Sequence, residues 1–135
     1  MSLGIGGIGR KVIEDEIYVV YEYAVYNWNH ENWKEMMENF DGVITIEKSC
    51  FVKPAIHTKL KRQPNGKKKL VTKKIYTDVP FEKLFQQGKI VIENCSHAWR
   101  FTQEGYDSIA MKLIYKLFRE YRQQETLPQT IEFFQ

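Results

Sequence analysis

The chain has few of the residues and patterns that mark specialised classes of protein. Two cysteines in 135 residues are too few for a disulfide framework, and four prolines beside 43% hydrophobic residues argue against extensive disorder. No apolar run reaches the about 18 residues that a membrane-spanning helix needs. Residues 1–11 have neither the basic leader nor the apolar segment of a signal peptide. We therefore expect a soluble, cytoplasmic protein whose residues 1–135 form a single domain.

Acidic residues are missing from one segment, residues 53–74, which contains nine lysines and arginines. The other positions hold eleven basic and seventeen acidic residues, so a segment of charge +9 is joined to a remainder of charge −6. Such a distribution creates a basic pole that attracts polyanions from a distance and is weakened by salt. It equally permits head-to-tail contact between copies of the protein.

The basic segment has the pattern of a β-hairpin. Pro64, Asn65 and Gly66 suit a three-residue turn, because proline fixes φ at the first central position and glycine accepts a positive φ. A turn there predicts these cross-strand pairs: Gln63 with Lys67, Arg62 with Lys68, Lys61 with Lys69, Leu60 with Leu70, Lys59 with Val71, Thr58 with Thr72 and His57 with Lys73. Lysine opposite lysine costs stability, so the fold alone does not account for these residues.

Hydrophobic periodicity divides the remaining chain into strands and helices. Alternating β-branched and aromatic residues predict strands within 11–28, 43–53 and 89–95. Apolar residues at helical spacing predict short helices within 29–42 and 78–88, and a long helix within 102–124. Residues 127–135 are expected to form a last strand or a docked extended segment. The predicted class is α+β, a mostly antiparallel sheet with a basic hairpin, two short helices and one long C-terminal helix packed on a sheet face.

Two sets of residues have the residue types of a ligand site but not its structural context or spacing. Residues 4–9, GIGGIG, match the dinucleotide-binding pattern, but no strand precedes them and a strand follows. We expect residues 1–9 to be flexible or added during cloning. Cys50, His57, Cys95 and His97 would form a zinc site if strands 43–53 and 89–95 were neighbours, yet their spacing departs from the usual zinc knuckle. Cys95 and His97 also point to the same side of a predicted strand. That position brings the two side chains near each other but does not align the thiol with a histidine base, as a cysteine nucleophile requires.

The charge pattern therefore predicts a non-catalytic protein, without cofactor or metal, that binds DNA or RNA through the hairpin. Lysines at alternate positions suit phosphate contacts, and basic residues near the turn suit groove or backbone contacts. The predicted contact residues are Lys59, Lys61, Arg62, Lys68, Lys69 and Lys73. The alternative is a protein-interaction or self-associating module that docks on an acidic surface. We expect no membrane partner, because the segment lacks an aromatic face to insert.

Overall fold

A five-stranded antiparallel sheet forms the body of the protein in the computed structural model, which describes residues 4–52, 55–62, 64, 66–75, 78–98 and 100–134. The strand order is β6-β3-β2-β1-β7, with every neighbouring pair antiparallel. The strands are β1 (Ile5–Glu14), β2 (Tyr18–Asn27), β3 (Gly42–Glu47), β6 (Ile90–Glu93) and β7 (Thr130–Phe134). Together with the helices, this sheet confirms the predicted α+β class.

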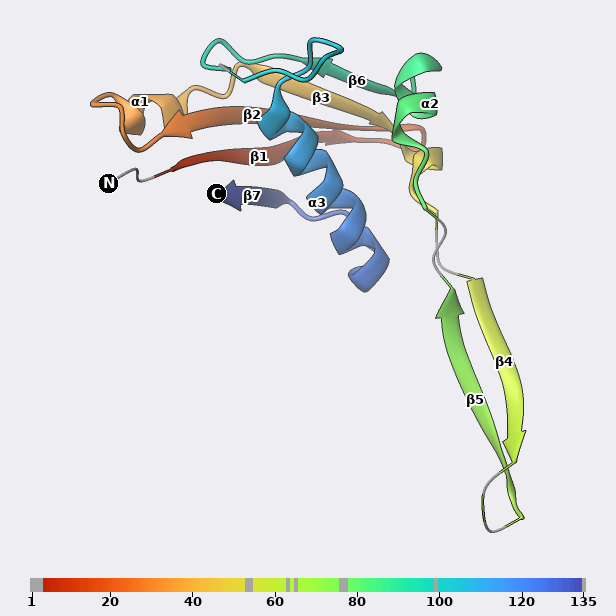
Figure 1. The fold of residues 1–135 in the computed structure, drawn as a ribbon. Helices are drawn as coiled ribbons and strands as arrows, with labels where there is room; N and C mark the ends of the chain where they lie inside the picture. Colours follow the sequence, from red (N-terminus) through yellow and green to blue (C-terminus); the bar gives the residue numbers. More distant parts are fainter. Residues whose placement is uncertain are drawn as a thin grey trace.

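Among the residues that the structure describes, three helices accompany the sheet: α1 (Trp33–Glu38), α2 (Phe81–Gln86) and α3 (Ser108–Gln124). The long helix α3 crosses one face of the sheet (Figure 1). The apolar stripe that predicts this helix runs from Tyr106 to Tyr121, and its inner six members are buried: Ile109, Ala110, Leu113, Ile114, Leu117 and Phe118. In the described part of the chain, no helix has the length and apolar character required to cross a membrane.

The core lies between α3 and the central strands. Val19, Tyr21, Tyr23 and Val25 of β2 are at most 2% exposed, as their alternation predicts. Ile44 of β3 pairs with Tyr21 of β2 on one side and with Ile92 of β6 on the other, so it joins two other core residues across the sheet. Full burial of each such side chain contributes roughly 1.5–3 kcal/mol, so this layer stabilises the body.

The N-terminal strand differs from the flexible segment that we expected. Residues 5–9 belong to β1, and residues 6–9 pair on both edges, with Gly7 opposite Val25 of β2 and Phe133 of β7. A β-carbon on Gly7 would collide with the Ile109 side chain of α3, so glycine lets the helix approach the sheet closely. The GIGGIG motif is thus a strand beneath a helix, and no helix follows it to bind a phosphate.

Two element boundaries, the turn between β1 and β2 and the start of α1, also differ from those that hydrophobic periodicity predicts. Asp15 turns the chain between β1 and β2, because its Oδ1 accepts hydrogen bonds from the backbone N–H groups of Ile17 and Tyr18. The helix expected within 29–42 begins only at Trp33, since His30 Nδ1 accepts from the N–H of Asn32 and holds the preceding turn. Polar side chains that bond their own backbone shorten these elements.

A second sheet consists of two strands alone, β4 (Ala55–Arg62) and β5 (Lys68–Ile75). These strands form a hairpin that projects away from the five-stranded sheet and from α3 (Figure 1). The predicted basic hairpin is therefore present as a separate arm of the molecule.

Candidate functional site

The register of the β4–β5 hairpin is the predicted one. Arg62 pairs with Lys68, Lys61 with Lys69, Leu60 with Leu70, Lys59 with Val71, Thr58 with Thr72 and His57 with Lys73. Gly66 has a φ of 83°, the left-handed conformation that the turn needs. Gln63 and Asn65 lie outside the described residues, and the pairing of Gln63 with Lys67 stays a prediction.

Basic residues occupy neighbouring cross-strand pairs near the turn of the hairpin. Lys61 stands directly opposite Lys69, and the next pair toward the turn is Arg62 with Lys68. The Lys68 side chain is exposed. For the other five predicted contact residues, Lys59, Lys61, Arg62, Lys69 and Lys73, the described structure gives the strand position and not the side chain. The hairpin thus brings the predicted residues together along one ribbon.

Apolar side chains on the hairpin are also exposed, which the sequence did not indicate. Ile56 is 69% exposed, and the paired residues Leu60 and Leu70 are each 61% exposed. A two-stranded hairpin without further packing is only marginally stable in water. Apolar surface that stands clear of the core is typical of an interaction surface.

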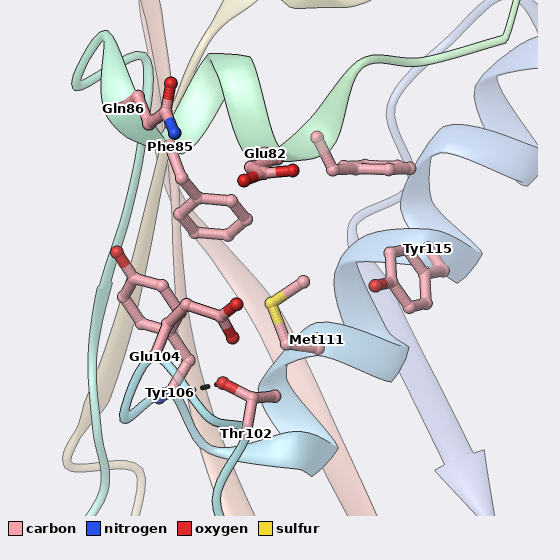
Figure 2. A pocket seen from close by; sticks show the side chains of 9 residues that line it. Glu82, Phe85, Gln86, Thr102, Glu104, Tyr106, Met111 and Tyr115 are labelled. Carbon is pink, nitrogen blue, oxygen red and sulfur yellow. Dashed lines mark hydrogen bonds between the residues drawn. The ribbon is translucent and has the colours of Figure 1, made fainter.

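A hollow with aromatic walls lies between α2, the 100–107 loop and α3, and the periodicity of the sequence does not predict it. Its volume is about 300 Å³, and Figure 2 shows the side chains around it. The lining residues are Phe81, Glu82, Phe85, Gln86, Thr102, Glu104, Tyr106, Met111 and Tyr115. They come from two segments about twenty residues apart in sequence, so only the packing of α2 near α3 reveals the site.

The two cysteines have the properties of core residues. Cys50, in the 3-10 turn η1 (Lys48–Cys50), and Cys95, after β6, are both buried. Burial, reinforced by the nearby Asp107 carboxylate, raises the pKa of the Cys95 thiol to about 11. The thiol is therefore protonated at neutral pH and lacks the reactivity of a nucleophile.

The zinc arrangement receives no support from the described part of the chain, which contains no group of three or more His, Cys, Asp and Glu side chains suited to a metal. His57 lies in β4, on the projecting hairpin, whereas Cys95 belongs to the body. The side chain of His57 is outside the described structure.

A buried polar cluster joins β2 to the start of α3. Asp107, 1% exposed, accepts a hydrogen bond from the Tyr23 hydroxyl (2.9 Å) at Oδ2 and from the Ile109 backbone N–H (3.0 Å) at Oδ1. The Tyr23 hydroxyl in turn accepts from the backbone N–H of Cys95 (3.1 Å). Burial raises the pKa of Asp107 above its usual value. Because every group has a partner and the cluster is closed to solvent, it acts as an N-cap that fastens α3 to the sheet.

The chain matches no known protein family, no characterised protein and no solved structure. Its function must therefore be inferred from the charge and geometry of its own surfaces.

Proposed function

We propose that this is a non-catalytic protein that binds nucleic acid through the β4–β5 hairpin. The observation that supports this most strongly is the presence of nine basic and no acidic residues in segment 53–74, most of them on a ribbon that stands away from the sheet (Figure 1). A two-stranded ribbon fits the major groove of DNA and can also follow a phosphate backbone. Its projection would let it reach a polyanion without repulsion from the acidic body.

The proposed roles follow from the register. Lysines at 59, 61, 69 and 73 neutralise phosphates, while Arg62 and Lys68 contact the groove or the backbone near the turn. Phosphate contacts of this kind provide affinity without reading sequence. The proposed partner is therefore DNA or RNA, bound with strong dependence on salt.

Fluorescence anisotropy with mixed-sequence DNA and RNA across a salt series tests this function. If four phosphates of duplex DNA are neutralised, log K falls against log salt with a slope of about −3.6. Replacing the lysines at 59, 61, 69 and 73 together by glutamine should weaken binding and flatten that slope. The matched control makes the same change at four lysines of the body, Lys34, Lys83, Lys89 and Lys116, and should retain most of the slope.

Absence of binding at low salt by the folded protein would contradict the proposal. An equal loss of slope in both quadruple variants would show that net charge, rather than the hairpin, governs binding.

A second candidate is a protein-interaction or self-associating module, and the exposed Ile56, Leu60 and Leu70 favour it. An acidic partner, including the body of another copy, would pair with the lysines while its apolar groups cover the leucines. Light scattering across a salt series should then show assemblies that dissociate as salt rises. Leu60→Thr with Leu70→Thr should abolish these assemblies, whereas a protein that stays monomeric at low salt excludes self-association.

A cytoplasmic location is part of the proposal. Its support is the pair of buried free thiols, Cys50 and Cys95, which a reducing compartment maintains. Fractionation of cells that express the full chain tests it, and recovery outside the cytoplasm would overturn it.

A further inference from the structure

Aromatic rings form the walls of the hollow between α2 and α3. Phe85 of α2 stacks on Tyr106, with ring centroids 4.7 Å apart and an interplanar angle of 30°. Phe81 meets Tyr115 of α3 edge to face, with centroids 4.8 Å apart. Tyr115 is 47% exposed, so this aromatic surface is open to a ligand from solvent.

Two carboxylates enter the same hollow. Figure 2 shows Glu82 on the α2 side and Glu104 on the side of the 100–107 loop. Both side chains are exposed, and neither forms an ion pair with any described residue. The lining contains no lysine or arginine. The hollow therefore presents negative charge beside aromatic faces without a cation of its own.

We propose that this hollow binds the alkylated ammonium group of an organic cation. Aromatic faces attract such a group through their quadrupole, and carboxylates add direct charge attraction. Methyl groups on the ammonium can lie against the aromatic rings of the wall, among them Phe85 and Tyr106. The volume of about 300 Å³ is at the lower end for small-molecule sites and accommodates a trimethylammonium group with part of its chain.

Other ligand classes fit less well. A neutral apolar ligand would remove water from two carboxylates without compensating their charge. A bare divalent metal ion takes six or more oxygen ligands, or three to four nitrogen and sulfur ligands, and this hollow supplies two carboxylates flanked by rings. An anion would be repelled.

Choline and its neutral isostere 3,3-dimethylbutanol, titrated by NMR into the full chain, separate charge from shape. We expect the choline methyl protons to shift upfield, because they lie over ring faces, and to receive saturation from the protein. The isostere should bind at least tenfold more weakly. Equal binding of the two compounds, or no choline shift at about 10 mM, would overturn the proposal.

Charge-neutral variants test the carboxylates. Glu82→Gln combined with Glu104→Gln should weaken choline binding at least tenfold, while the matched pair Glu31→Gln with Glu93→Gln, two exposed acids elsewhere, should leave it unchanged. Tyr106→Leu should remove the upfield shift of the methyl protons. Because Glu82 and Glu104 are exposed, circular dichroism of the double variant should show native folding, and unchanged choline binding in that variant contradicts the site.

The cation can come from a free small molecule or from a modified side chain. A short peptide with trimethyllysine, compared with the same peptide with unmodified lysine and with choline, distinguishes the two sources. Tighter binding of the trimethyllysine peptide assigns a protein tail, and tighter binding of choline assigns a free metabolite. Preference for unmodified lysine would overturn the assignment to an alkylated group. The proposal does not depend on the hairpin, so it survives or fails independently of nucleic-acid binding.

Discussion

The body and the hairpin differ in the exposure of their leucine side chains. Leu113 of α3 is fully buried against the sheet, whereas Leu60 and Leu70 of the hairpin are each 61% exposed. The body has a contiguous buried core between the sheet and α3, although Ile17, Val52 and Phe134 on its surface are also more than half exposed. The hairpin leaves its apolar groups and its charge to solvent. This contrast indicates that the stability of the protein resides in the sheet and α3 rather than in the hairpin.

Truncation of the two kinds of leucine should separate these roles most clearly. Leu113→Ala removes a fully buried side chain and should lower the free energy of unfolding by about 3 kcal/mol. Leu70→Ala should change it by less than about 0.5 kcal/mol. Urea denaturation measures both values. A large cost for Leu70→Ala would show that the hairpin packs on the body or on another copy in solution.

Removal of the buried carboxylate should cost somewhat less. Asp107→Ala deletes the acceptor for Tyr23 and for the Ile109 N–H, and should lower the free energy of unfolding by about 2 kcal/mol. Thr58→Ala, a polar truncation on the exposed hairpin, serves as the comparison and should have almost no effect. If the two changes cost the same in thermal or urea unfolding, the buried cluster does not fasten α3.

The same carboxyl should make stability depend on pH. Its folded pKa is raised by burial, so above the ordinary carboxyl pKa the native state retains a proton that the unfolded chain has released. The contribution of Asp107 is therefore full below its unfolded pKa and is lost as pH rises through the folded pKa. Asp107→Asn cannot titrate, so the difference in unfolding free energy between the two proteins should vary with pH across that window. A difference that is flat with pH would contradict the raised pKa.

Two glycines offer the smallest and most closely matched comparison. Gly88 of the body and Gly66 of the hairpin have φ angles of 72° and 83°, and a β-carbon would meet nothing within 4 Å at either. Alanine therefore introduces only backbone strain, of about 1 kcal/mol. Gly88→Ala should lower global stability by that amount, whereas Gly66→Ala should leave it unchanged and accelerate amide hydrogen exchange in β4 and β5. A global loss from Gly66→Ala would show that the hairpin unfolds together with the body.

Local signals in the sequence predicted the regular elements well. The turn residues Pro64 and Gly66 determined the hairpin register, and the apolar stripe from Ile109 to Phe118 identified the buried face of α3. These patterns depend on neighbouring residues, so periodicity and turn chemistry are sufficient to detect them.

Features that depend on distant contacts could not be predicted. Gly7 is in a strand because it pairs with Val25 and with Phe133, and the residue is glycine because the Ile109 side chain of α3 passes directly over it. Glycine has low strand propensity, so the local sequence suggested flexibility instead. The aromatic hollow arises in the same way, since Phe85 and Tyr106 meet only after α2 and α3 have packed. The basic hairpin could be predicted from its charge and turn residues, and its role in binding stays a prediction.

The pairing of β1 with β7 has a consequence for synthesis on the ribosome. Of the five strands of this sheet, β1 is synthesised first and β7 last, and Gly6 of β1 pairs with Phe134 of β7. Until translation of β7 is complete, β1 must wait with one backbone edge unpaired and open to association with other nascent chains. The hairpin needs only its own short turn and can form while it leaves the exit tunnel, so the hairpin would be complete before the five-stranded sheet.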